Sequence, residues 1–399
     1  MLLFTDSMLK FNLFHVFTHT TTLHSTVTVH CRNHFSNLSV SVSNTNQDDS
    51  FMLSNIINSA GLSPETSLKL SKKLKLRKYD DDYDGPNPVI QLLRNYGFSA
   101  SQISTLVKKK PFVLLSKVEK TLLPKLEFLL SIGVSITDLP KILIGNTDLL
   151  TTSLDKNIIP LYQIIRSLVR NDKEVVSVLK RWTMNFYTDS MVPNIEVLRN
   201  HGVPQRSVSL LVSNFPNVAF CKHSRFVEAV NLVKEMGFNP LKSNFVLAIL
   251  VIARMDKETW ELKLKIFERW GWSEDICLLA FQKYPRYMAT SEKKIQKILS
   301  FLVNDMGFTP DDIARCAAIL NRSLEKTIVP RSTVIKILKS RGLIKSSLSL
   351  HSFISISEKI FLDRYITPFQ KDLPLLLDAY KGQNSNRSYG FTLYSEDIY

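Results

Sequence analysis

Three copies of a six-residue motif place a lysine after an acidic residue and four residues before a proline. They read Glu119-Lys120-Thr121-Leu122-Leu123-Pro124, Asp155-Lys156-Asn157-Ile158-Ile159-Pro160 and Glu325-Lys326-Thr327-Ile328-Val329-Pro330. The acidic residue suits the first turn of a helix, where the helix dipole favours negative charge. The lysine has two readings: it pairs with the acid and stays solvated, or it binds an external anion such as a phosphate.

The same position in the chain holds other cations. Counted from the glycine that precedes each of them, Lys120, Lys156, Arg225 and Lys294 all stand at position 23. Lys326 stands at position 19, and four residues are close to one helical turn. If these segments stack as similar repeats, the five cations form a ladder along one side of the molecule.

Three prolines stand 14 residues after a glycine, Pro111, Pro216 and Pro285, and a second group of cations flanks the first and the last of them. A proline disfavours helix at the residue before it, so it ends the preceding helix and redirects the chain. The flanking candidates for anion binding are Lys109, Lys283 and Arg286. They either line a groove or lie at solvated helix ends.

Motifs for catalysis are missing from the sequence. It has no glycine-rich phosphate loop, no paired-histidine zinc motif and no evident cysteine–histidine pair. The four cysteines, Cys31, Cys221, Cys277 and Cys316, are scattered, which argues against a disulfide framework or zinc site and suits a reducing compartment. We therefore expect no enzymatic activity, no metal and no cofactor.

The elements that position the cations are indicated by evenly spaced glycines. Successive intervals are 36, 36, 69, 35, 34, 36 and 35 residues, and 69 is two periods with one glycine missing. The eight glycines are Gly61, Gly97, Gly133, Gly202, Gly237, Gly271, Gly307 and Gly342. A period near 35 residues is typical of an α-solenoid. We predict an all-α fold of about 8–9 helical repeats.

Each glycine has an apolar residue four positions before it and another directly after it. This is the pattern of a Schellman helix end, in which glycine adopts a left-handed conformation. Ser, Thr or Asn stands two residues after six of the glycines, where it can cap the next helix; the six are Ser63, Ser99, Ser135, Asn239, Ser273 and Thr309. We expect Asn171 to take the place of the missing glycine.

The first 47 residues differ from the rest. They hold fourteen Ser/Thr, five of the eight histidines and one acidic residue, Asp6. Such a leader is typical of an organelle transit peptide, with a disordered tail as the alternative. We assign residues 1–47 to this leader, 51–380 to the helical repeats and 381–399 to a disordered tail. The sequence has no apolar run long enough to cross a membrane.

The repeats carry the positive charge of the chain. Residues 1–50 hold two basic and three acidic residues, so the other 349 carry +15 − (−1) = +16. A basic excess of this size favours a polyanionic partner, most simply nucleic acid. A generally basic soluble protein is the alternative.

The repeated apolar-x-x-x-Gly-apolar-Ser pattern, the proline 14 residues on, and segments 122–126 and 323–331 together resemble the plant branch of the mitochondrial transcription termination factor (mTERF) family. The resemblance runs from about residue 51 to residue 380. It implies a curved, left-handed superhelix of three-helix repeats whose basic groove holds double-stranded nucleic acid. It also implies that Arg331, which follows the family's proline, contacts a phosphate or base.

The resemblance implies a role in organellar gene expression, in a mitochondrion or alternatively a chloroplast. We expect a monomer that binds double-stranded DNA and regulates or terminates transcription, with other organellar expression proteins as further partners. Two alternatives stay open: binding of structured RNA in intron splicing or ribosome assembly, and a protein-interaction solenoid with an incidental basic surface. Phosphate contacts carry no base information, so the sequence does not separate DNA from RNA.

Overall fold

The structure is a computed structural model that describes residues 86–182, 188–345 and 347–382, together with Ser63, Glu65, Thr66 and Lys69. All the regular secondary structure in these residues is helical, so the predicted all-α class is confirmed. The predictions for Gly61, for the leader and for residues 383–399 lie outside the described residues. The described residues divide into two compact units, one that ends at Val227 and one that begins at Glu228, and the boundary falls within one helix.

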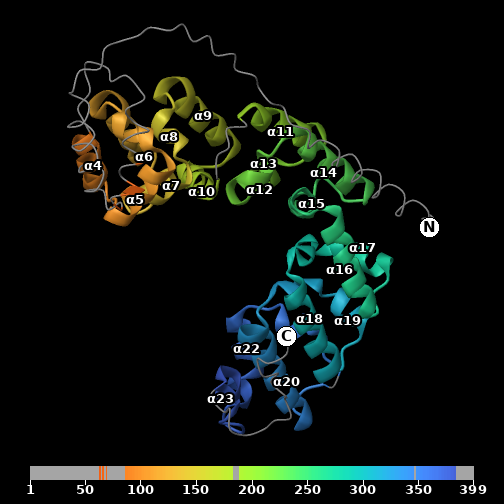
Figure 1. The fold of residues 1–399 in the computed structure, drawn as a ribbon. Coiled ribbons are helices and arrows are strands. Elements are labelled where there is room, and N and C mark those ends of the chain that lie inside the picture. Colours follow the sequence, from red (N-terminus) through yellow and green to blue (C-terminus); the bar gives the residue numbers. More distant parts are fainter. Residues whose placement is uncertain are drawn as a thin grey trace, which may run out of the picture. The chain divides into compact units, whose positions relative to one another are not determined.

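The N-terminal unit is a succession of helices and short helical turns (Figure 1). Its elements are α4 (Pro86–Asn95), α5 (Ala100–Lys109), η2 (Pro111–Leu115), η3 (Val118–Leu122), α6 (Leu123–Ser131), α7 (Leu139–Gly145), α8 (Asp148–Thr151), η4 (Leu154–Ile158), α9 (Ile159–Leu168), α10 (Asp172–Arg181), α11 (Thr188–Asn200), α12 (Gln205–Asn214) and α13 (Pro216–Ala219). Helix α14 (His223–Glu235) continues into the next unit.

The C-terminal unit continues the same succession and ends in a group of shorter helices (Figure 1). Its elements are α15 (Ser243–Arg254), α16 (Lys257–Arg269), α17 (Glu274–Lys283), η5 (Pro285–Ala289), α18 (Glu292–Ser300), η6 (Phe301–Asp305), α19 (Pro310–Ala314), η7 (Ala317–Asn321), η8 (Leu324–Ile328), α20 (Val329–Ser340), α21 (Leu350–Ile354), α22 (Glu358–Tyr365), η9 (Thr367–Phe369) and α23 (Leu376–Lys381).

A typical repeat has three parts: a first helix, a short helical turn and a third helix. One repeat begins at each of α5, α7, α10, α12, α15, α17 and α19, which makes seven in the described part. The typical repeat is therefore the three-helix unit that the family resemblance implied. The repeat that begins at α15 lacks the short helix, because Val251 stands at the proline position and continues α15.

The glycine spacing predicts the helix ends correctly. All seven described glycines of the series have positive φ, between 68° and 92°. Six make the Schellman bond, as in Phe98 N–H to Leu93 O at 3.0 Å. At Gly307 the bond shifts by one residue, and Phe308 N–H donates to Leu302 O, because the chain before it forms the wider π-helical turn η6.

Some glycines also allow one repeat to approach the next. A Cβ atom on Gly97 would lie 3.1 Å from the carbonyl oxygen of Ile136. One on Gly271 would lie 3.1 Å from Cγ of Pro310. At Gly342 a Cβ would meet nothing within 4 Å. The first two positions therefore require glycine for two reasons, the backbone conformation and the packing between repeats.

The predicted caps are confirmed in part. Ser99 and Thr309 each form a capping box with the residue three positions on. Ser273 caps α17. Asn239 does not cap a helix: its side chain accepts from the Leu241 N–H at 2.9 Å within a turn, and α15 starts only at Ser243.

The prediction for Asn171 is wrong. Its φ of −158° is extended, and its side chain accepts from the Glu174 N–H, so it is the N-cap of α10. The preceding helix, α9, ends without any left-handed residue. Its last carbonyl, that of Leu168, accepts instead from Gln205 Nε2 at 2.9 Å and from the Ser209 hydroxyl at 2.7 Å.

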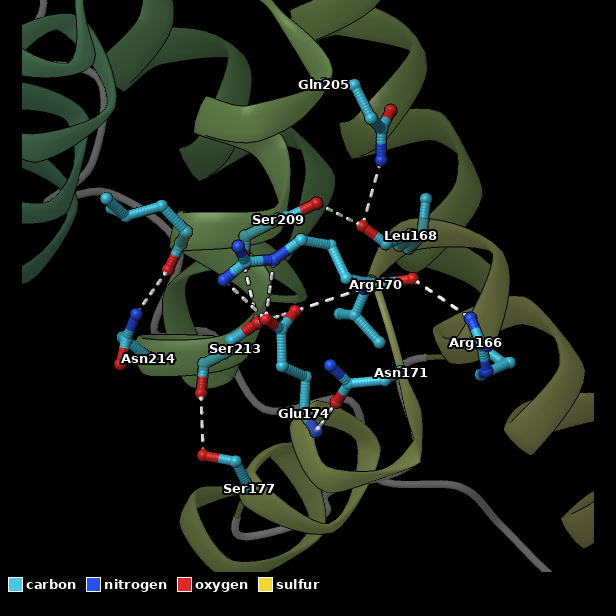
Figure 2. Close-up of polar contacts among 12 residues, drawn as sticks. Arg166, Leu168, Arg170, Asn171, Glu174, Ser177, Gln205, Ser209, Ser213 and Asn214 are labelled. Carbon is cyan, nitrogen blue, oxygen red and sulfur yellow. Dashed lines mark hydrogen bonds and ion pairs between the residues drawn. The ribbon is translucent and has the colours of Figure 1, made fainter.

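Figure 2 shows this polar contact, in which side chains from α12 reach the end of α9. Glu174 lies beside it and pairs with Arg170 at 2.7 Å, while the Ser213 hydroxyl donates to Glu174 at 3.3 Å. Burial opposes ionisation of Glu174, but these bonds outweigh it and hold its pKa below the usual value. Donors from the following repeat thus replace the missing glycine in satisfying this helix end.

Neighbouring repeats are also joined by buried donors that point at the end of a short helix. In each case a side chain of one third helix binds backbone carbonyls about 25 residues further on. The pairs are Lys125 with Leu150, Asn194 with Ala219 and Cys221, Lys263 with Thr290, and Arg331 with Phe353, Ile354 and Ile356. Burial lowers the pKa of both lysines.

Three of the four tryptophans pack in the core, and Trp270 is half-buried. Trp182, Trp260 and Trp272 are buried. Trp272 follows a helix-ending glycine and stacks on Phe267, with ring centroids 4.8 Å apart. Among the described helices, none is both long enough and apolar enough to cross a membrane.

Candidate nucleic-acid interface

The three six-residue motifs fold alike. Each forms a π-helical turn, η3, η4 or η8, that leads directly into a third helix with proline in its first turn. The turns that contain Lys156 and Lys326 are capped in the same way, by the hydroxyls of Ser153 and Ser323. Lys120, Lys156 and Lys326 are all exposed. The motif therefore presents a lysine to solvent at the start of three third helices.

The prolines redirect the chain as expected. Lys110, Phe215 and Tyr284 each precede one, and their backbone angles nearly coincide, with φ between −141° and −138° and ψ between 51° and 72°. Each proline then opens a short helical turn. In the repeats that begin at α5 and α17, one short helical turn thus separates the cations at the end of the first helix from those at the start of the third.

Charges are segregated along the first helices. Helix α17 has Glu274 and Asp275 in its first turn and Lys283 in its last. Helix α10 likewise starts with acids and ends with Lys180 and Arg181. This order suits the helix dipole on its own. Because first helices of successive repeats lie side by side, this order of charges also places the cations at their C-terminal ends near one another.

We call the two cation-rich edges the basic edges, one in each unit. Each consists of cations at the ends of first helices, in the following turns and at the starts of third helices. The N-terminal basic edge holds Lys108, Lys109, Lys120, Lys156, Lys180, Arg181, Lys222 and Arg225, and the C-terminal basic edge holds Arg254, Lys283, Arg286, Lys294, Arg315, Arg322 and Lys326. Acids accompany some of these cations: Lys180 pairs with Asp138 at 2.7 Å, and an acidic residue directly precedes each motif lysine. Elsewhere, Arg166 pairs with Asp172 at 3.1 Å.

Several predicted residues also have structural roles. Lys109 is exposed, yet its Nζ donates to the Ile144 carbonyl at 2.9 Å. Lys294 donates to the Asn321 carbonyl at 3.1 Å. Arg225 is half-buried. Lys283 and Arg286 are exposed and lie on either side of Pro285.

Arg331, the residue that the family resemblance placed at a phosphate or base, lies inside the protein. Only 5 % of its surface is exposed. Its guanidinium donates to three carbonyls at 2.8–3.1 Å and lies 4.8 Å from the centre of the Phe361 ring. We therefore correct the expectation: Arg331 joins α20 to α21 and is not part of an accessible surface.

Three exposed cations of the C-terminal basic edge were not among the sequence candidates. Arg254 ends α15, Arg315 follows α19 directly, and Arg322 follows η7. None of them follows a proline or stands at the position of the motif lysine. The sequence contains an indirect indication for Arg322: it stands four residues, about one helical turn, before the candidate Lys326.

No described residues form a group of three or more His, Cys, Asp or Glu that could hold a metal ion. Cys221, Cys277 and Cys316 are free. The features that remain are stacked three-helix repeats and exposed cations along one edge. They define a class of all-α repeat protein with a basic surface.

The mTERF family model matches this chain at residues 90–252 and 247–362, which is more than half of its length. The chain belongs to the mTERF family.

Two relatives come from Arabidopsis thaliana. "Transcription termination factor MTERF15, mitochondrial" is 23 % identical over 286 residues, which are 71 % of this chain and 56 % of the relative. "Transcription termination factor MTERF8, chloroplastic" is 19 % identical over 268 residues, 64 % of this chain and 51 % of the relative. The chain thus matches about half the length of each relative.

Proposed function

We propose that this protein binds double-stranded DNA in an organelle and regulates transcription there, by termination. The observation that carries the proposal is the recurrence of exposed cations at the ends of first helices, in the following turns and at the starts of third helices in each unit. Phosphates of a nucleic-acid backbone are the natural partners of such an edge. Family membership and the names of both relatives support the connection with transcription.

The test is a binding titration of the full-length protein with labelled duplex DNA, duplex RNA and single strands of DNA and RNA of equal length, at several salt concentrations. We expect duplex DNA to bind most tightly, with the logarithm of affinity falling linearly with the logarithm of salt concentration. A preference for duplex RNA would indicate that structured RNA, and not DNA, is the target. Failure to bind any of the four would contradict nucleic-acid binding and favour a protein partner.

We further propose that the protein acts in the mitochondrion and that residues 1–47 direct its import. The acid-poor, hydroxyl-rich composition of this segment supports the proposal, as does the mitochondrial relative. The chloroplast is the alternative destination, because the second relative is chloroplastic. A fluorescent fusion of the full-length chain that enters neither organelle would contradict an organellar role.

A further inference from the structure

In the C-terminal basic edge, cations from two successive repeats come together around Cys316, which lies between α19 and η7. Burial raises the pKa of the Cys316 thiol, and the positive charges of Arg322 and Lys283 oppose that rise. The turn that follows Lys283 packs on the turn that precedes Arg322, since the Thr290 hydroxyl at the end of η5 donates to the Leu320 carbonyl oxygen in η7 at 3.3 Å. Lys283 ends α17 in one repeat and Arg322 follows η7 in the next, so the cluster spans the junction between the repeats.

Asn321 ties two more cations to this junction. Its carbonyl oxygen accepts from Lys294 Nζ at 3.1 Å. With its amide oriented to satisfy its neighbours, the Asn321 side chain donates to the Arg286 carbonyl oxygen at 3.1 Å. We call Lys283, Arg286, Lys294 and Arg322 the junction cluster.

The two repeats stack in parallel, which keeps the acids of α17 and α19 away from the junction cluster, whereas Glu292 and Glu325 stand two to three residues from Lys294 and Arg322. Gly271, before α17, approaches Pro310, the first residue of α19, while Lys283 is the last residue of α17 and Cys316 stands two residues after the end of α19. The acids of α17 stand in its first turn, and a ten-residue helix is about 15 Å long. No ion pair or side-chain hydrogen bond occupies Lys283, Arg286 or Arg322 among the described residues.

The equivalent junction of the N-terminal unit is different. Lys109 corresponds to Lys283, both 12 residues after a glycine, but its Nζ already binds the Ile144 carbonyl. Lys110 pairs with Asp148 at 2.6 Å. Asp148 stands eight residues before the motif lysine, where the C-terminal repeat has the neutral Ala318.

Other positions reinforce the difference. Phe112 corresponds to Arg286, both 15 residues after a glycine. Thr152 corresponds to Arg322, both four residues before a motif lysine. A cation that is already bonded to protein gains less from a phosphate than one that is solvated. At the four positions of the junction cluster, the C-terminal junction therefore has four cations and the N-terminal junction two. The further N-terminal cations are Lys108, which is exposed, and Lys110, which pairs with Asp148.

We propose that the junction cluster is the principal phosphate-binding site of this protein, where Lys283 and Arg322 from adjacent repeats bind the backbone of one nucleic-acid strand. Arg286 extends the site, and Lys294 holds the Asn321 turn in place. This inference rests on the proposed nucleic-acid binding and names the part of the surface that dominates it.

The experiment compares three double variants of the full-length protein with identical changes in net charge. The first, Lys283→Glu with Arg322→Glu, reverses the junction cluster. The second, Lys120→Glu with Lys156→Glu, reverses two cations of the N-terminal basic edge. The third, Lys141→Glu with Lys173→Glu, changes exposed lysines outside both basic edges and serves as the charge control.

Affinity for a labelled mixed-sequence DNA duplex is measured against salt concentration. We expect the junction variant to bind at least about tenfold more weakly and to lower the salt slope by about two, because each of the two side chains would no longer neutralise a phosphate. The N-terminal variant should lose about threefold, and the control less. Unchanged circular dichroism and melting temperature show that each variant is folded. The neutral double variant, Lys283→Gln with Arg322→Gln, should show a smaller loss of DNA affinity than the charge-reversed one.

Equal losses in the junction and N-terminal variants would overturn the inference but leave nucleic-acid binding standing. An unchanged salt slope in the junction variant would overturn it as well. If the unaltered protein binds no nucleic acid, the proposed function itself fails.

Discussion

Single cations in this fold divide into solvated side chains and buried donors. Lys125, Lys263 and Arg331 are each about 5 % exposed or less, and all donate to backbone carbonyls of the following repeat. A charge removed from water is costly unless bonds compensate it. Carbonyls at a helix C-terminus provide that compensation, because they lie at the negative end of the helix dipole.

Replacing Arg331 by methionine tests the role of a buried donor. The change keeps an apolar stem but leaves the carbonyls of Phe353, Ile354 and Ile356 without their donor, so we expect a loss of about 3 kcal/mol in the free energy of unfolding. Urea denaturation measures it. Arg341→Met, at an exposed arginine in the same unit, should cost less than about 0.5 kcal/mol.

The same pair of variants separates the structural role from the binding role that the resemblance implied. Measured on protein that is fully folded, the Arg331→Met variant should keep the DNA affinity of the unaltered chain. A large loss of DNA affinity at unchanged stability would indicate that Arg331 takes part in DNA binding.

At the scale of elements, the helix ends and the fold class follow from local sequence, whereas the positions of side chains depend on distant contacts. Gly97 and Ser99 specify their own conformations through nearby hydrogen bonds, so spacing alone predicts them. Asn171 was misassigned because the end of α9 is satisfied by Gln205 and Ser209, more than 36 residues away.

The candidate interface was predictable to a similar extent. The exposure of Lys120, Lys156 and Lys326 follows from a motif that folds locally. The burial of Arg331 does not, because its partners lie in α21, more than 20 residues on. The sequence does not distinguish a lysine or arginine that is solvated from one that binds a buried carbonyl. The stacking of the repeats determines which environment the side chain has.

Two helix-ending glycines allow the backbone and packing contributions to be separated. Gly342→Ala should cost about 1 kcal/mol, because φ is +68° but no atom lies within 4 Å of the new Cβ. Gly271→Ala should cost about 1 kcal/mol more, since φ is +81° and the Cβ also meets Pro310 at 3.1 Å. Urea denaturation of both variants measures the difference, and equal losses would contradict the packing role of Gly271.

On the scale of the whole molecule, the chain is a series of repeats that contact mainly their neighbours, divided into two units within α14. In such an arrangement stability is a sum of local terms and neighbour interfaces, and a defect spreads only as far as the interfaces transmit it. The buried donors are such interfaces. Asn194 joins α11 to the end of α13 in one unit, and Arg331 joins α20 to α21 in the other.

Hydrogen exchange followed by mass spectrometry tests this locality with one variant in each unit. Asn194→Leu should speed exchange in α11 to α13 and leave α18 to α22 unchanged, because the carbonyls of Ala219 and Cys221 lose their donor while the C-terminal unit keeps its own contacts. Arg331→Met should do the reverse, with faster exchange in α20 to α22 and no change in α5 to α9. A uniform rise along the chain in either variant would contradict local transmission, because it would mean that both units open together.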